Sequence, residues 1–81
     1  MRTSARRSPV SIIVHAGRLR FEIARRGWSA SDLAREARLS PATISAALSG
    51  RPVATSSVAL ISRAFAKSPP DEMIVRLLFG E

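Results

Sequence analysis

The sequence has no cysteine and only one histidine, His15, among its 81 residues. A chain without cysteine forms no disulfide and offers no thiolate to a metal, and a single histidine does not build a zinc site alone. The chain also lacks paired acidic residues in a catalytic motif and a glycine-rich phosphate loop, so no nucleophile has a base beside it. We therefore expect a protein that is not an enzyme and that works without a cofactor or a metal.

Long hydrophobic runs are missing as well. No segment approaches the roughly 20 apolar residues that span a bilayer. The apolar residues 10–14 are interrupted by Ser11 and followed by basic residues, which argues against a signal peptide. We expect a cytoplasmic protein, located at the nucleoid, with no membrane partner. Hydrophobic residues still make up 46% of the chain, enough for the core of one small domain.

Acidic residues are few and unevenly placed. Thirteen basic residues stand against six acidic ones, which gives a net charge of +7. Residues 1–26 contain seven arginines and one acidic residue, Glu22, whereas the charges of the last 30 residues cancel. This asymmetry favours a polyanion, such as nucleic acid, that meets one end of the molecule. A solvated arginine-rich face is the alternative.

Apolar spacing predicts a mainly helical chain. Residues 1–8 show no apolar periodicity and are expected to form a flexible basic arm in front of a single domain, residues 9–81. The β-branched residues of segment 9–15 favour a strand, although a helix with Pro9 in its first turn is an alternative. From about residue 16 the pattern predicts a helix that stops at Gly27, followed by Trp28 as a core residue.

Two short helices are predicted next. Ser29 and Asp32 have the spacing of a capping box, which starts a helix over about residues 30–37. Ser40 followed by Pro41 is a second start, because serine caps free amides and proline lacks the N–H that would be left unpaired. It predicts a helix over 41–49 that ends at Gly50. The expected inward residues are Ile44, Ala47 and Leu48, and the expected outward ones are Ala42, Thr43, Ser45, Ala46 and Ser49.

The last third of the chain continues this pattern. Thr55 is the expected cap of a helix over 56–68, whose inward positions are Val58, Ile61, Ala64 and Phe65. Residues 73–79 fit either a helix or a strand. If both terminal segments were strands, they could pair as a short two-stranded ribbon.

The helix, turn and helix of residues 30–49 fit a helix-turn-helix. A helix that enters the major groove must bring short side chains close to the base edges, and the outward residues of 41–49 are small. Base contacts are predicted for Pro41, Ala42, Thr43, Ser45 and Ala46. Phosphate contacts are predicted for Ser29, Ser31, Arg38, Ser40, Ser49, Arg51 and Arg18. The plainer alternatives are helix caps for Ser29 and Ser40 and solvated side chains for the others.

Residues 27–53, GWSASDLAREARLSPATISAALSGRPV, resemble the lambda repressor and Cro-like, or XRE, family of helix-turn-helix proteins, most closely its actinobacterial phage, prophage and integrative-element regulators. The resemblance covers about residues 16–68. It implies a bundle of four to five helices that acts as a homodimer on a palindromic operator and represses transcription. It also implies that a basic arm, here Arg2, Arg6 and Arg7, follows the DNA groove. The residues that carry it are Leu33, Ala34, Leu39, Ser40, Thr43, Ile44, Ser45, Leu48, Gly50 and Ile61.

Two departures from the family stand out. Arg38 occupies a turn position where the family usually has glycine and where φ is often positive. Pro41 and Ala42 stand where relatives often place long base-reading side chains. We therefore expect specificity to come from Thr43, Ser45, nearby arginines and DNA shape.

The sequence is compatible with two other functions. Antitoxins of toxin–antitoxin pairs often use the same fold, and residues 73–80 could bind such a protein partner or serve as a homodimer interface. The basic arm could instead coat nucleic acid without regard to its sequence. The first alternative predicts a partner that co-purifies, and the second predicts binding that ignores sequence.

Overall fold

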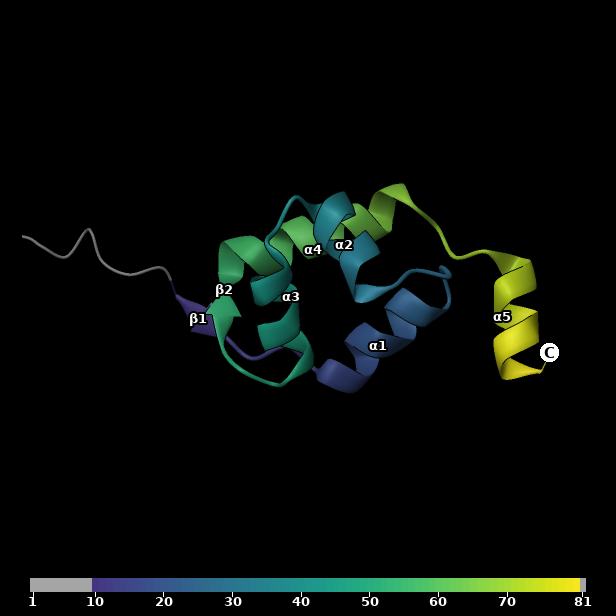
Figure 1. The fold of residues 1–81 in the computed structure, drawn as a ribbon, viewed down its shortest axis with the longest axis horizontal. Helices are drawn as coiled ribbons and strands as arrows, with labels where there is room; N and C mark the ends of the chain where they lie inside the picture. Colours follow the sequence, from purple (N-terminus) through teal and green to yellow (C-terminus); the bar gives the residue numbers. More distant parts are fainter. Residues whose placement is uncertain (1–9, 81) are drawn as a thin grey trace, which may run out of the picture.

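The computed structural model describes residues 10–80, so the predicted arm and its contacts at Arg2, Arg6 and Arg7 lie outside the described residues. The described chain contains five helices and one two-stranded ribbon (Figure 1), and the mainly helical class is confirmed. Within this part, no helix is long and apolar enough to cross a membrane. In chain order the elements are β1 (Ser11–Ile12), α1 (Ala16–Ala24), α2 (Ala30–Ala37), α3 (Pro41–Leu48), β2 (Val53–Ala54), α4 (Thr55–Lys67) and α5 (Glu72–Phe79).

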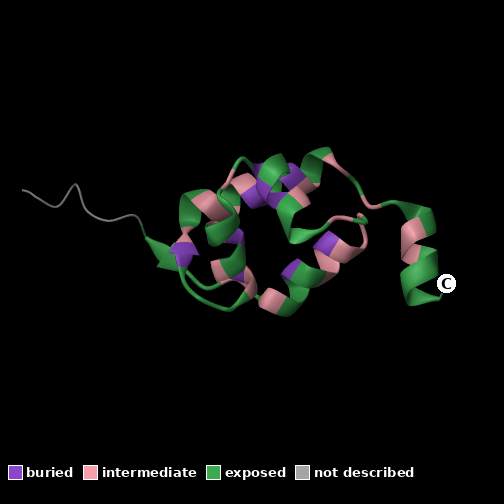
Figure 2. Cartoon of the chain, in the orientation of Figure 1, coloured by how far each residue is buried: buried purple, intermediate pink, exposed green. Residues whose placement is uncertain are grey.

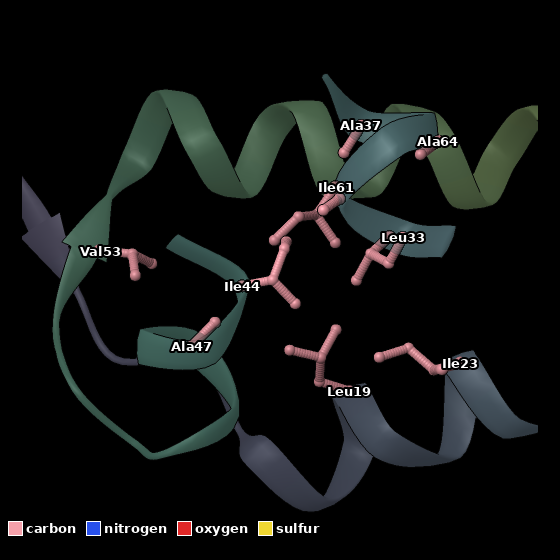
Figure 3. Close-up of a cluster of buried hydrophobic side chains, with 10 residues drawn as sticks. Leu19, Ile23, Leu33, Ala37, Ile44, Ala47, Val53, Ile61 and Ala64 are labelled. Carbon is pink, nitrogen blue, oxygen red and sulfur yellow. The ribbon is translucent and has the colours of Figure 1, made fainter. Parts of the chain in front are cut away.

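The hydrophobic core lies between the first four helices. Figure 3 shows the side chains of Leu19, Leu33, Ile44 and Ile61, from four different helices, converging on one point. Leu33 and Ile44 are the largest fully buried side chains. Trp28 and Phe65 cover the edge of this core and stack with ring centroids 5.9 Å apart. The helix-turn-helix is therefore held as one packed unit rather than by its turn alone.

Local capping explains where α2 and α3 begin. The backbone N–H of Ser29 donates to Asp32 Oδ2 (2.8 Å), and the backbone N–H of Asp32 donates to Ser29 Oγ (3.1 Å), which is the predicted capping box. Ser40 Oγ accepts from the backbone N–H of Thr43 (3.2 Å), and Pro41 is the first residue of α3. The predicted starts of both helices, residues 30 and 41, are confirmed.

The turn between these helices has a left-handed residue at Arg38, with φ 60° and ψ 43°. Arg38 is the only non-glycine residue with positive φ among residues 10–80. The sequence predicts this, because the family that it resembles usually has glycine at this turn position. A β-carbon in this region costs on the order of 1 kcal/mol. The chain thus tolerates backbone strain at a position where glycine would avoid it.

The N-terminal segment pairs with a different partner from the one predicted. Only Ser11–Ile12 of segment 9–15 is a strand, and it pairs antiparallel with Val53–Ala54, after α3, rather than with the end of the chain. The expected cap at Thr55 is also wrong, because Ala54 is the N-cap of α4. Thr55 is the first residue of the helix, its backbone N–H donates to the carbonyl of Val10 in the ribbon (3.0 Å), and no side chain caps the start of α4.

The end of the chain is a helix, α5. Asp71 follows two prolines and its carboxylate accepts from the backbone N–H groups of Met73 and Ile74, which caps the helix and excludes the strand alternative. Phe79 packs on Phe21 of α1 with ring centroids 5.2 Å apart. Gly27 has φ 71°, a conformation that glycine adopts without strain, and a β-carbon there would also lie 2.6 Å from Ile74 Cδ1 and displace the end of that side chain.

Much of α5 nevertheless stays uncovered. No residue of α5 is buried, as the green and pink helix at the right of Figure 2 shows. Met73, Leu77 and Leu78 expose 59%, 77% and 54% of their surface. An apolar surface of this kind on a small protein marks an interaction site more often than a solvated one.

Candidate nucleic-acid interface

The surface of α3 is built from small residues. Pro41, Ala42 and Ser45 are exposed, and Ser49, the C-cap, is exposed beside them. Bulky side chains would hold the helix axis away from a groove floor, so this surface permits a close approach of the backbone to DNA. The structure thus places three of the five predicted base-contact residues fully on the surface.

The other two, Thr43 and Ala46, face outward only in part. Both are half-buried, and Ala46 packs against the hydrophobic core. The Thr43 hydroxyl lies 3.0 Å from the Ser40 hydroxyl, so it is already engaged in a hydrogen bond. A regular α-helix places residues 43 and 46 at the border between its buried and exposed faces, which explains the difference from the predicted outward orientation.

Two hollows flank this surface of α3. The first has a volume of about 290 Å³ and lies between α3, the start of α2 and Arg20 of α1; Ser31, Pro41, Ser45 and Ser49 line it. The second has a volume of about 310 Å³ and lies between α3 and the start of α4; Ala42, Thr43, Ala46 and Ser57 line it. The structure therefore gathers the five predicted base-contact residues, together with Ser31 and Ser49, around one surface.

The helix starts at this surface offer backbone N–H groups. Ser29 and Ser40 act as caps, as the plainer interpretation held, and their hydroxyls accept from the third amide of each helix. The hydrogen bond from the Ser29 backbone, with those from Arg35 and the Ser29 side chain, holds the pKa of Asp32 below its ordinary value. Arg35 lies 2.6 Å from this carboxylate and offsets its charge. The remaining amides of the first turns are free to bind an anion.

Arg20 is a site residue that sequence reasoning did not single out. Its Nη2 donates to the carbonyl of Leu48 (2.9 Å), the last residue of α3, and it lines the first hollow. A guanidinium carries five N–H donors, so one bond to Leu48 leaves others available. Nothing in the local sequence distinguishes Arg20 from its arginine neighbours, because the bond spans 28 residues.

The other predicted phosphate contacts are distributed differently. Arg51 is exposed just after α3, and its backbone N–H donates to the carbonyl of Ala46 (2.9 Å), a residue that lines the second hollow. Arg18 lines instead a groove of about 510 Å³ between α1 and α4, together with apolar residues such as Leu19 and Phe65. Arg38 lines a hollow with Arg63 and Lys67 of α4. The structure thus brings Arg51 close to the surface of α3 but does not bring Arg18 or Arg38 there.

Three arginines of the basic N-terminal region meet at one carboxylate. Glu22 forms ion pairs with Arg18 (2.7 Å), Arg25 (3.0 Å) and Arg26 (2.7 Å). Burial of Glu22 raises its pKa, but the hydrogen bond from Arg26 and the charges of Arg25 and Arg18 outweigh this and hold the pKa below its ordinary value. Three of the four arginines in residues 18–26 are therefore paired inside the protein, which weakens the interpretation of these arginines as a polyanion-binding surface.

Among these three arginines, Arg26 has a structural role. Its side chain is only 7% exposed. Besides Glu22 it donates to the carbonyls of Phe65 (3.1 Å) and Ser68, at the end of α4. It thus joins α1 to the end of α4 and satisfies carbonyls that a helix end leaves unpaired.

These lowered pKa values predict an acid-sensitive fold. The folded state binds fewer protons at Glu22 and Asp32 than the unfolded state does, so their stabilisation is present above the ordinary carboxyl pKa of about 4 and is lost as the pH falls through the folded values. We expect the thermal unfolding midpoint, followed by circular dichroism, to drop below about pH 4. Glu22→Gln should reduce this drop, whereas Glu72→Gln, at an exposed residue of α5, should not. Equal pH profiles for the two variants would contradict the assignment.

The short helices α2 and α3 cross each other. Small exposed residues and free backbone N–H groups at the two helix starts share one surface. This arrangement defines a DNA-binding helix-turn-helix domain. A family model described as helix-turn-helix matches residues 19–72, and the chain belongs to this family, which is of the lambda repressor-like, or XRE, type. Membership assigns the protein to sequence-specific binding of double-stranded DNA and to transcription regulation, in a family that is not enzymatic. No curated protein and no solved structure shows a significant match to the chain.

Proposed function

We propose that the protein is a transcriptional repressor of phage or prophage type, acting at the cytoplasmic nucleoid, whose helix α3 reads a palindromic operator in the major groove. The observation that carries this proposal is the small exposed surface of α3 between two hollows. Pro41, Ala42, Thr43, Ser45 and Ala46 are the proposed base-contact residues. The proposed contacts to the phosphates of the DNA come from Ser29, Ser31, Ser40, Ser49 and Arg51, with Arg20 added, and from Arg2, Arg6 and Arg7 of the arm.

The proposed repressor binds its operator as a homodimer. A palindromic site mirrors a two-fold axis of the protein, and a two-fold interface uses the same surface on both copies. The exposed face of α5 supports such an interface. Met73 and Leu77 lie one turn apart on α5, as do Glu72 and Arg76. An antiparallel pair of α5 helices would therefore cover apolar residues with apolar residues and bring Glu72 close to Arg76 of the second copy.

This interface predicts a change of mass. Leu77→Glu places a carboxylate on the apolar face of α5 in each copy, where association would bury it without a partner. We expect the unchanged chain to be a dimer and the variant a monomer when mass is measured by light scattering after gel filtration. Ala59→Glu, an equal charge change on the exposed face of α4, is the control. If the unchanged chain is monomeric at high concentration, the α5 interface is ruled out.

The uncovered α5 surface also favours a second candidate function, that of a DNA-binding antitoxin whose residues 73–80 bind a toxin. In that case an apolar protein partner, rather than a second copy, covers Met73, Leu77 and Leu78. A partner that co-purifies with the chain from its native cells and that Leu77→Glu releases would favour this function. A toxin-like neighbouring gene would do the same.

The main test of the proposed function is selection of binding sites from a random duplex pool. The affinity for the enriched site and for a scrambled site is then measured at two salt concentrations. A palindromic site bound at least about a thousandfold more tightly than the scrambled one is the expected result. Equal, steeply salt-dependent affinities for both sites would mean that phosphate contacts dominate and would move non-specific coating ahead.

Ser45 offers a finer test of groove reading. Ser45→Ala removes a hydroxyl from the exposed surface of α3, and if that hydroxyl contacts a base, discrimination between operator and mismatched duplex should fall by about 1 to 3 kcal/mol. Thr43→Ala should have a similar or smaller effect, because its hydroxyl is shared with Ser40. Ser62→Ala on α4 is the matched control. Equal losses on operator and scrambled DNA would reassign Ser45 to phosphate binding.

A further inference from the structure

Three cations of the described chain lie around one hollow and form no ion pair within residues 10–80. Arg38 at the end of α2 and Arg63 and Lys67 in the second half of α4 are exposed and line one hollow of about 210 Å³. Within residues 10–80, the ion pairs involve Arg18, Arg25, Arg26 and Arg35, and none involves these three. Their charges are therefore available to a ligand, unlike those of three of the four arginines in residues 18–26.

The end of α2 fixes the position of Arg38. Its φ of 60° is the left-handed conformation that ends the helix, and its backbone N–H donates to the carbonyls of Ala34 and Arg35. The side chain leaves α2 from this fixed point and lines the hollow.

This basic hollow is separate from the DNA-facing surface. It shares no residue with either of the two hollows beside α3. Helix α4 begins at Thr55, next to the ribbon, and a rise of 1.5 Å per residue places Arg63 about 12 Å and Lys67 about 18 Å further along its axis. The free cations thus lie at the far half of α4 and at the end of α2, whereas the DNA surface uses the start of α2.

The lining of the hollow indicates what it binds. Ala37, Leu60 and Ala64 contribute apolar surface, and Glu36 is the one acidic residue among its lining residues. A phosphodiester backbone presents only sugar carbons to Leu60, whereas a peptide supplies carboxylates together with complete aliphatic side chains. We propose that the basic hollow is a docking site for an acidic segment of a protein partner, whose carboxylates pair with Arg38, Arg63 and Lys67 and whose apolar side chain covers Leu60.

The proposal rests on the fold and not on the operator-reading function. Because each exposed ion pair contributes little by itself, the partner segment must supply several carboxylates at once. A suitable probe is a short fluorescein-labelled peptide of glutamates with interspersed leucines, and its binding is followed by fluorescence anisotropy.

The decisive comparison uses two double variants of equal charge. Arg63→Gln with Lys67→Gln should weaken peptide binding by at least about tenfold, whereas Arg18→Gln with Arg35→Gln, also exposed, should change it by less than about twofold. Equal losses in the two double variants would show a general charge effect and would overturn the proposal. Undiminished binding to the first double variant would overturn it as well.

Arg38→Gly separates binding from stability. Glycine removes the guanidinium and relieves the positive φ, so the thermal unfolding midpoint should stay level or rise while the affinity for the peptide falls several-fold. Unchanged affinity would remove Arg38 from the site. This variant guards against the objection that weaker binding merely reflects a damaged fold.

Competition with DNA distinguishes the basic hollow from the surface of α3. The labelled peptide should stay bound when the duplex enriched by selection is added to saturation. Displacement by that duplex would place the peptide on the DNA surface and overturn the proposal. If no duplex binds the protein specifically, the proposed repressor function fails, but the comparison of the two double variants still decides the docking site.

Discussion

Replacing Arg26 with methionine should lower the free energy of unfolding by about 2 to 3 kcal/mol, whereas Arg18→Met should cost less than about 0.5 kcal/mol. Both arginines pair with Glu22 at 2.7 Å, but the Arg26 side chain is 7% exposed and that of Arg18 is 66% exposed. Losing Arg26 leaves the carbonyls of Phe65 and Ser68 without this donor and removes one partner of a largely buried carboxylate. Arg18 and Arg25 remain beside Glu22, so the expected loss is below the full cost of an unpaired buried charge.

The measurement is urea unfolding followed by circular dichroism. Because methionine replaces most of the apolar stem of arginine at both positions, the comparison of the two variants isolates the polar contacts of the guanidinium. Similar losses at both positions would show that burial does not set the contribution of these ion pairs. A loss below about 1 kcal/mol at Arg26 would contradict its role in joining α1 to α4.

The helix-turn-helix was predictable because its signals are local. Ser29 with Asp32 and Ser40 with Pro41 act within three residues, so the starts of α2 and α3 follow from short stretches of sequence. The positive φ of Arg38 could be anticipated from the family, which usually has glycine there. Capping, proline and glycine rules concern neighbouring residues, and no knowledge of the tertiary fold is needed to apply them.

The contacts that were missed join distant parts of the chain. The first strand pairs with residues more than 40 positions away, and Arg26 reaches Phe65 and Ser68 over 39 and 42 positions. The N-cap of α1 is His15, whose Nδ1 accepts from the backbone N–H of Arg18, although histidine is not among the preferred capping residues. Net charge also misleads over residues 18–26, because a single glutamate engages three of the four arginines there.

The candidate site was predictable in its residue types but not in its shape. Small polar residues on α3 indicated a groove-reading helix, yet only the packed bundle shows that Ala46 is partly covered and that Arg20 reaches the end of α3. The separation of the basic hollow from the surface of α3 likewise depends on how α2 and α4 cross. Sequence spacing within one helix contains no information on that crossing.

Ala42→Glu should weaken binding to the selected operator by about a hundredfold, equivalent to about 2.7 kcal/mol. Ala42 is exposed in the first turn of α3 and lines the second hollow beside this helix. In the proposed complex it faces the groove, where a carboxylate opposes the negative potential of the DNA. The same carboxylate interacts favourably with the helix N-terminus, so the free energy of unfolding should stay unchanged or rise slightly.

A gain in stability together with a loss of binding would be hard to explain by damage to the fold. Ala59→Glu, on the exposed face of α4, makes the same change in net charge and should weaken binding by no more than about twofold, because exposed charges beyond a Debye length of about 8 Å are largely screened. Equal effects of the two substitutions, measured by anisotropy of a labelled operator at fixed salt, would mean that DNA responds to the overall charge of the protein. An intact affinity in Ala42→Glu would show that the start of α3 does not enter the groove.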